Sequence, residues 1–186
     1  MTQEKKKTPE EILQEAQQMI GNETKPVDNQ YPVEYEPIRR YCMMVDDDNP
    51  LFLDPEYAKK TKHGGVIFPP FAAFGIMSGG APGAIATWFE ATETPIMPPT
   101  PGQFFVNMAQ EWEWFKPIMV GDRLNTKFRL ADVYMKPIRL DPKAFWVVFE
   151  IITGNQRGEP VCTVRNIVIL HRSPEEVAAD QPHEGG

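Results

Sequence analysis

In Leu124-Asn125-Thr126-Lys127-Phe128-Arg129-Leu130, the residues Leu, Thr, Phe and Leu alternate with Asn, Lys and Arg. Successive side chains of a β-strand point to opposite faces, so this alternation predicts a half-buried strand. Residues 104–114, 145–153 and 159–170 are predicted strands as well, and Gly154-Asn155-Gln156-Arg157-Gly158 suits the turn of a hairpin between the last two. Strand, turn and strand in succession predict an antiparallel sheet.

In the 104–114 stretch the even positions are mostly apolar, and we expect them to share one face. The apolar set on that face is Phe104, Val106, Met108, Trp112 and Trp114, while Asn107, Glu111 and Glu113 are expected on the other face.

The N-terminal part of the chain carries helix signals instead. Thr8-Pro9-Glu10-Glu11 combines a hydroxyl cap, a proline in the first turn and carboxylates at the positive end of the helix dipole. Asp54-Pro55-Glu56 and Ser173-Pro174-Glu175-Glu176 repeat this start signal, the first for a turn through Lys60. Helices followed by a run of antiparallel strands predict an α+β fold.

Between these signals we expect a polar loop over residues 22–31 and a short strand over residues 33–35. Pro37 is expected to open a second helix whose apolar face is Ile38, Tyr41, Cys42 and Val45. The Pro-rich stretch from Pro95 to Gly102 predicts an irregular connection.

Composition bounds the class of protein. With 186 residues, 41% of them apolar, the chain fits one domain, expected over residues 31–172 between an N-terminal helix and loop (1–30) and a C-terminal tail (173–186). The sequence has no apolar run long enough for a membrane span and no signal peptide at residues 1–8, so we expect a cytoplasmic protein.

Charge and cysteine content exclude other classes. A net charge of −7 argues against nucleic-acid binding, which needs a basic face. Cys42 and Cys162 lack metal-ligand spacing and sit in apolar stretches, so buried, reduced thiols and no metal site are expected.

The loop Asp46-Asp47-Asp48-Asn49-Pro50-Leu51-Phe52-Leu53-Asp54-Pro55 resembles the catalytic segment of the MaoC-like hydratases and dehydratases, which are hot-dog-fold proteins. In that family Asp-x-Asn-Pro-Leu-His supplies an Asp and a His that move protons during hydration of an enoyl thioester. Asp47 and Asn49 match this motif, but the His position is Phe52. A phenyl ring has no titratable group, so it can neither accept nor donate a proton. General acid–base catalysis contributes ~10²–10⁴ in rate.

Two further motifs extend the resemblance to residues 16–172. His63-Gly64-Gly65-Val66-Ile67 resembles the stretch before the family's central helix, and residues 115–124 resemble its Phe-x-Pro-Val-x-x-Gly-Asp-x-Leu entry into the strands. The chain is most similar to the FAS1-type, N-terminal MaoC-like branch. There, some subunits lack the dyad and pair with a smaller catalytic hot-dog subunit, as in mycolic-acid dehydratases and steroid side-chain hydratases.

The resemblance implies a central helix over Phe71–Glu90, yet Gly79-Gly80 and Pro82-Gly83 interrupt it. Interior Gly costs ~1 kcal/mol and Pro ~3 kcal/mol relative to Ala. A short or broken helix is therefore expected, which would leave room for a bulky acyl group.

The candidate site residues each have a plainer reading. Asp47 and Asn49 suit an Asx turn after a helix, and Phe52 is either a core residue or a plug in the empty dyad position. His63 is the only stand-in for the missing base; its alternative is a solvated loop histidine beside Lys59, Lys60 and Lys62.

The expected substrate-binding residues are Phe68, Phe71, Trp112, Trp114, Lys59 and Lys62. The aromatic residues, with Phe115 and Trp146, equally suit a sheet core. The lysines either attract the phosphates of coenzyme A or form a solvated face.

Three functions follow from these patterns. The first is a non-catalytic, acyl-binding subunit of a heteromeric enoyl-CoA hydratase, in a heterodimer or heterotetramer. Its expected substrate is a bulky acyl-CoA, such as one of the steroid type. The second is a self-sufficient homodimeric hydratase that uses Asp47 and His63, and the third is a non-enzymatic thioester-binding hot-dog protein. No cofactor is expected beyond the coenzyme A thioester of the substrate.

Overall fold

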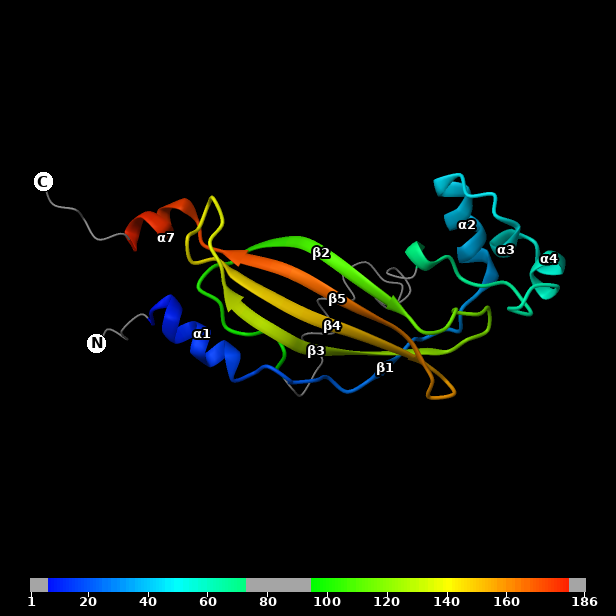
Figure 1. Cartoon of the computed structure of the whole chain (residues 1–186), viewed down its shortest axis with the longest axis horizontal. Coiled ribbons are helices and arrows are strands. Elements are labelled where there is room, and N and C mark those ends of the chain that lie inside the picture. The colour runs from blue at the N-terminus through cyan, green and yellow to red at the C-terminus, as the bar shows by residue number, and fades with distance from the viewer. Residues whose placement is uncertain (1–6, 73–94, 181–186) are drawn as a thin grey trace, which may run out of the picture.

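A five-stranded antiparallel sheet forms the centre of the protein (Figure 1). The computed structural model describes residues 7–72 and 95–180. The strand order is β1-β3-β4-β5-β2, with bounds β1 Val27–Asp28, β2 Phe104–Trp114, β3 Leu124–Met135, β4 Phe145–Asn155 and β5 Pro160–His171. The four long strands lie where the alternation predicts them, and the antiparallel α+β class is confirmed.

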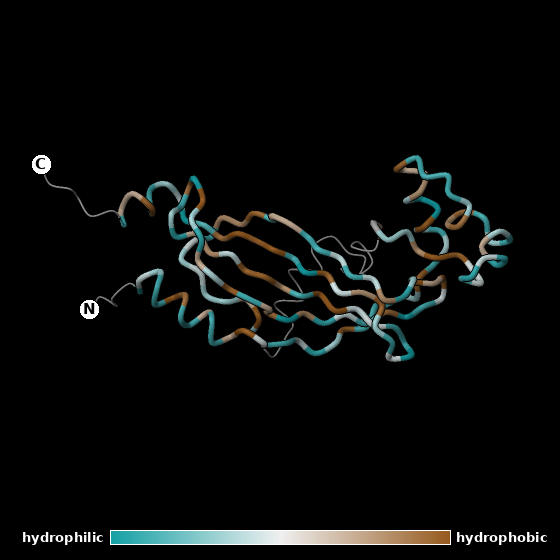
Figure 2. The backbone as a smooth tube through the Cα atoms, in the orientation of Figure 1, coloured by the Kyte–Doolittle hydropathy of each residue, from teal (hydrophilic) through white to brown (hydrophobic). Residues whose placement is uncertain are grey.

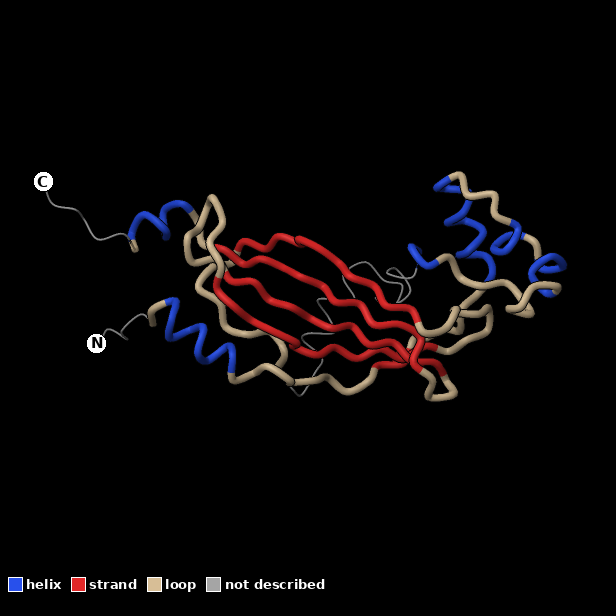
Figure 3. Tube along the Cα trace, in the orientation of Figure 1, coloured by secondary structure: helices blue, strands red, loops and turns tan. Residues whose placement is uncertain are grey.

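Helices α1 (Pro9–Gln17) and α7 (Pro174–Ala179) lie at the end of the sheet near the two termini (Figure 3). Both predicted starts are confirmed. Thr8 and Ser173 accept hydrogen bonds from the backbone N–H of Glu11 and Glu176, whose carboxylates accept in return from the cap residue's N–H.

A small helical cap lies at the opposite end of the sheet (Figures 1 and 3). It consists of α2 (Tyr35–Val45), α3 (Pro50–Leu53) and α4 (Pro55–Lys59). The strand predicted over residues 33–35 is wrong because α2 already begins at Tyr35. Pro37 is tolerated as the third helical residue, where its missing N–H has no intrahelical acceptor. Val33 instead exchanges backbone hydrogen bonds of 2.8 Å with Gly121 and Asp122.

The predicted polar loop over residues 22–31 contains a strand. Val27 and Asp28 form β1 and pair with Thr126 and Asn125 of β3. Two residues are too few for an alternation to be recognised in the sequence.

The predicted face of β2 is wrong for part of the strand. The register against β5 shifts between Asn107 and Ala109, so one extra residue interrupts the ladder. A bulge of this kind reverses which side chains face the core. Trp112 and Trp114 therefore lie on one face, whereas Phe104 lies on the other and stacks on His171, with ring centroids 5.3 Å apart.

The core covers one face of the sheet in two clusters. One cluster joins the cap to the end of the sheet beside it and contains Ile38, Cys42, Phe52, Ala58, Phe68, Phe128, Ile151, Cys162 and Val164, among others. The other lies beside α1 and contains Ala16, Leu130, Val133, Phe145, Val147, Phe149, Val168 and Leu170. Figure 2 shows the hydrophobic stretches along the strands and the hydrophilic turn at the end of the β4–β5 hairpin.

Both cysteines are free and buried, as predicted. Residues 95–103 form no helix or strand, which agrees with the predicted irregular connection. The predicted helix over Phe71–Glu90 falls almost wholly outside the described residues, which include only the 3₁₀ turn η1 (Pro70–Ala72). Across the described ranges, no helix has the length and apolar character needed to cross a membrane.

Candidate functional site

The Asp47 loop is held by its own side chains. Asp46 ends α2 in the left-handed conformation (φ 57°), and the Asp47 N–H donates to the carbonyl of Cys42 at 2.9 Å. Asp47 Oδ1 accepts from the Asn49 N–H at 3.0 Å, and Asn49 Oδ1 accepts from the Leu51 N–H at 3.0 Å and caps α3. The Asx-turn reading of these two residues is therefore confirmed.

Phe52 is a core residue. It is 8% exposed and packs in the cluster that includes Ile38, Cys42 and Ala58. Cys42 lies close enough to the loop that burial, and then the charge of Asp47, raise the pKa of its thiol. The position where the family's histidine is expected is thus apolar, filled and without a proton to transfer.

The stand-in base and the lysines lie on the helical cap and the loop that follows it. His63 is half-buried, and its backbone N–H donates to Thr61 Oγ1 at 3.2 Å. No hydrogen bond joins the His63 ring to Asp47. Lys59 is exposed and paired with Glu56 at 2.8 Å, and Lys62 is exposed.

Two of the predicted substrate-binding residues meet in one apolar cleft. Phe68 and Trp114 line a space of about 240 Å³ together with Ile67, Pro70, Phe115, Lys116, Pro117 and Ile118. Its walls are tied by backbone bonds, because the Phe68 N–H donates to the carbonyl of Ile118 at 2.8 Å and Ile67 bridges to Met119. The cleft is lined mainly by apolar side chains.

Trp112 stacks on Trp114 with ring centroids 5.5 Å apart, and both indoles pack against the cap-side core while remaining half-buried. Trp114 packs against the core and also lines the cleft, and its contact with a ligand stays a prediction. Phe71 lies in η1, at the border of the described residues.

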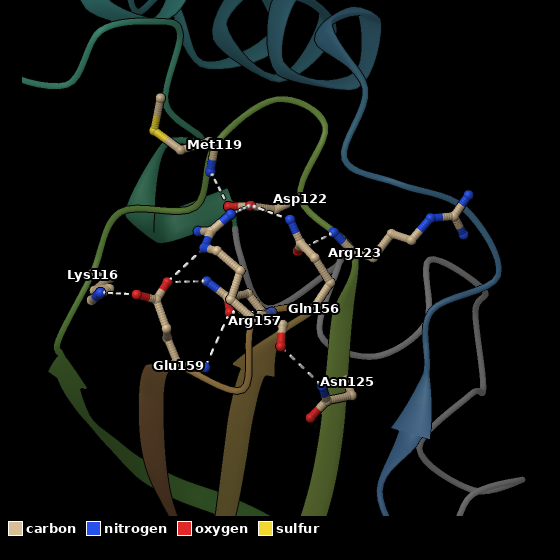
Figure 4. Close-up of polar contacts among 9 residues, drawn as sticks. Lys116, Met119, Asp122, Arg123, Asn125, Gln156, Arg157 and Glu159 are labelled. Carbon is tan, nitrogen blue, oxygen red and sulfur yellow. Dashed lines mark hydrogen bonds and ion pairs between the residues drawn. The ribbon is translucent and has the colours of Figure 1, made fainter.

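A polar network fixes the loop that forms one wall of the cleft (Figure 4). Asp122 is 3% exposed and accepts from the Met119 N–H at 2.8 Å, from Gln156 at 3.2 Å and from Arg157 at 3.3 Å. Glu159 bridges Asn155, Arg157 and the cleft residue Lys116, and hydrogen bonds from these three side chains lower the pKa of Glu159 to about 2. The aspartate of the Gly121-Asp122 motif thus shapes the cleft.

We expect Asp122→Ala to lower the free energy of unfolding by about 1–3 kcal/mol, because it removes the buried acceptor of three part-buried donors, on Met119, Gln156 and Arg157. Urea unfolding at neutral pH measures this as a lower midpoint at an unchanged slope. Glu159→Gln is the matched control in the same network, and we expect it to leave the midpoint nearly unchanged, since water screens the ion pairs of Glu159. Equal losses in both variants would contradict the structural role of Asp122.

Sequence reasoning missed Lys116, Pro117 and Ile118 as cleft residues, although it identified the motif that contains them. Within residues 7–72 and 95–180, no group of three or more His, Cys, Asp or Glu side chains is placed to hold a metal ion.

Comparison with known proteins places this arrangement in a family. The family model of the FAS1-like, dehydratase domain region matches residues 18–164. The chain belongs to this family. A UPF0336 protein of Saccharopolyspora erythraea is 32% identical over 163 residues, which are 86% of this chain and 94% of that protein.

Solved structures confirm the hot-dog fold. A chain of the ChsH1–ChsH2 complex of Mycobacterium tuberculosis is similar with a TM-score of 0.66 at 19% identity, over 88% of this chain and 96% of that one. A MaoC-like dehydratase of Rhodospirillum rubrum is similar with a TM-score of 0.59 at 22% identity, over 83% and 94% of the two chains. The predicted hot-dog fold is therefore confirmed, and the family model confirms the FAS1-type part of the predicted resemblance.

Proposed function

We propose that this chain is the acyl-binding, non-catalytic subunit of a heteromeric enoyl-CoA hydratase. A smaller MaoC-like subunit supplies the Asp–His dyad, and the coenzyme A thioester is the substrate. The observation that carries the proposal is the buried Phe52 at the position of the family's histidine.

Asp47 supports the same conclusion. A general base must reach the proton that it removes, but the carboxylate of Asp47 is engaged by the N–H of Asn49 in its own turn. No hydrogen bond connects Asp47 with His63, the base that a self-sufficient enzyme would use. A chain with these two features depends on a second subunit for proton transfer.

The free edge of the sheet supports a partner. In the described sheet β2 pairs only with β5, so its other backbone edge is open. Four apolar side chains of this edge strand are between 42% and 58% exposed: Phe104, Phe105, Val106 and Met108. A long apolar strand edge is a surface on which another strand adds. The similarity to a chain of the ChsH1–ChsH2 complex supports a second hot-dog subunit as its occupant.

The apolar cleft supports acyl binding. Its volume of about 240 Å³ is below the ~300–1,000 Å³ of a complete ligand site, so the acyl group occupies space beyond the cleft as well. The Gly79-Gly80 and Pro82-Gly83 interruptions favour a bulky, ring-containing acyl group of the steroid type. Lys59, Lys62 and Phe71 remain proposed contacts of the substrate, and the cytoplasm remains the proposed location.

Co-expression with a small MaoC-like hot-dog subunit that carries the Asp–His dyad tests this assembly. We expect the two chains to co-purify at equal stoichiometry. Val106→Lys should weaken assembly by about 100-fold or more, since burying an unpaired charge costs ~3–5 kcal/mol. Met44→Lys is the matched control, because Met44 is 76% exposed on α2 in the helical cap, outside the sheet.

Native mass spectrometry and a titration of labelled partner measure the effect. Assembly that survives Val106→Lys unchanged would contradict docking at the β2 edge. A stable homodimer that hydrates enoyl-CoA without any partner would establish the self-sufficient enzyme instead. A partner-bound complex without hydratase activity would favour the non-enzymatic thioester-binding protein.

A further inference from the structure

One polar residue interrupts the apolar inner face of β5. Cys162, Val164, Val168 and Leu170 project from this face and are buried, and Asn166 lies in the middle of this series. The register pairs Asn166 with Phe149 of β4 and with Gln110 of β2. Asn166 therefore lies at the boundary between the two core clusters, over the covered face of the sheet.

The side-chain oxygen of Asn166 lacks a donor. Asn166 Oδ1 is closed to water, and no group in residues 7–72 or 95–180 donates a hydrogen bond to it. Buried side-chain oxygens are satisfied in the large majority of cases, and an exception needs a physical reason. A ligand group that arrives with its own donor is such a reason.

Gln110 provides a second amide at the same place. It is half-buried, lies directly across the ladder from Asn166, and no hydrogen bond joins the two side chains. Each carboxamide offers one acceptor oxygen and two N–H donors. A hydroxyl group, which both donates and accepts, matches this pair.

The amide pair lies along the sheet from the apolar cleft. Gln110 and Trp114 are four residues apart on β2, on the same face and on the same side of the bulge. At ~3.3 Å per residue their separation along the strand is ~13 Å. An acyl group that extends along β2 from Trp114 would reach the two amides ~13 Å along the strand.

We propose that Asn166 and Gln110 form a polar subsite for a hydroxyl group on the acyl part of the substrate. Asn166 Oδ1 accepts the hydroxyl proton, and the Gln110 amide donates to the hydroxyl oxygen. The inference rests on the proposed acyl-binding function and narrows it to oxygen-substituted acyl groups.

Calorimetric binding to the heteromeric complex tests the subsite. The probes are saturated acyl-CoA thioesters with a hydroxyl at successive carbons, each compared with its keto and unsubstituted counterparts. We expect the hydroxylated probe to bind about 10- to 100-fold more tightly than either counterpart at one chain position, since a site built for a hydroxyl rejects analogues that lack it. The keto compound cannot donate to Asn166 Oδ1.

Asn166→Leu should remove this preference while leaving the melting temperature of the complex unchanged or raised, because it deletes an unsatisfied buried oxygen. Asn125→Leu is the matched control on the outer face of β3. Its amide is already bonded to the carbonyl of Asn155 at 3.5 Å, so the preference for the hydroxylated probe should remain.

Equal affinity for the three probes at every position, or binding of none of them, overturns the subsite. So does Asn166→Leu if it lowers the melting temperature and leaves the preference intact, because the protein itself would then satisfy the amide. The proposed function fails separately: a complex that shows the preference but hydrates no enoyl-CoA keeps the subsite and rejects the hydratase.

Discussion

Asp141→Leu is expected to lower the free energy of unfolding by about 3–5 kcal/mol, because it removes the buried partner of the Arg172 guanidinium and leaves only the partly exposed carboxylate of Asp180. Asp141 has no exposed surface and accepts from the Arg172 N–H at 2.9 Å and from its guanidinium at 2.7 and 3.1 Å. It also accepts from the Lys143 N–H at 2.9 Å. This ion pair joins the β3–β4 connection to the segment after β5.

The same arginine offers the control. Arg172 is also paired with Asp180 at 2.8 Å, but the Asp180 side chain is 40% exposed. Asp180→Leu should therefore cost below ~1 kcal/mol. Thermal unfolding separates the two, since ~1 kcal/mol corresponds to ~2–4 °C for a chain of this size. Similar losses of stability in both variants would contradict the expectation that the buried carboxylate of Asp141 contributes more than the exposed one of Asp180.

Acid should weaken the ion pair between Asp141 and Arg172. Burial acts to raise the pKa of Asp141, but hydrogen bonds from Arg172 and Lys143 outweigh it and lower the pKa below its ordinary value. The stability that results is fully present above the ordinary aspartate pKa of ~3.9 and is lost as pH falls through the lower pKa of the folded state. The difference between wild type and Asp141→Leu should accordingly shrink below about pH 4.

In the proposed heteromeric complex, the variants that affect turnover should lie in the partner. We expect replacement of the partner's dyad histidine by alanine to lower kcat/KM by ~10²–10⁴, the usual contribution of a general acid–base. Asp47→Asn and His63→Ala in this chain should change kcat/KM by less than ~3-fold, since neither side chain transfers a proton in this account. Steady-state hydration of one enoyl-CoA by the three variant complexes measures how much each of the two subunits contributes to proton transfer.

A large loss on Asp47→Asn or His63→Ala, with a minor effect of the partner variant, would assign the chemistry to this chain. Melting temperatures of the three complexes serve as the control, because Asp47 also holds its turn. A loss of turnover that tracks a loss of stability reports folding and leaves the catalytic assignment as stated.

Local signals in the sequence were sufficient for most elements. Both capping boxes and the four long strands depend on neighbours within a few residues, so spacing alone predicts them. The β2 bulge and β1 depend on which strand lies opposite. An extra residue in a strand is invisible until its partner is known, and this is why the faces of Phe104 and Trp112 were predicted to be the same.

Only some residues of the candidate cleft were predicted, because the others become neighbours only in the fold. Phe68 and Trp114 were expected to bind substrate, and the fold brings them into one cleft. Lys59 was expected to attract phosphate and is paired with Glu56 at the surface. Its contact with phosphate stays a prediction. Asn166 was missed, although an asparagine at an inward position of the strand over 159–170 was a visible signal: it interrupts an otherwise apolar face.

The dependence of this chain on a partner is tested by one comparison. Turnover of an enoyl-CoA is measured for the purified chain alone and for the same amount of chain in complex with the proposed partner. Phe52 replaces the proton carrier, so we expect a rate for the isolated chain at least ~10²-fold below that of the complex. An isolated chain that hydrates the substrate at the rate of the complex would contradict it.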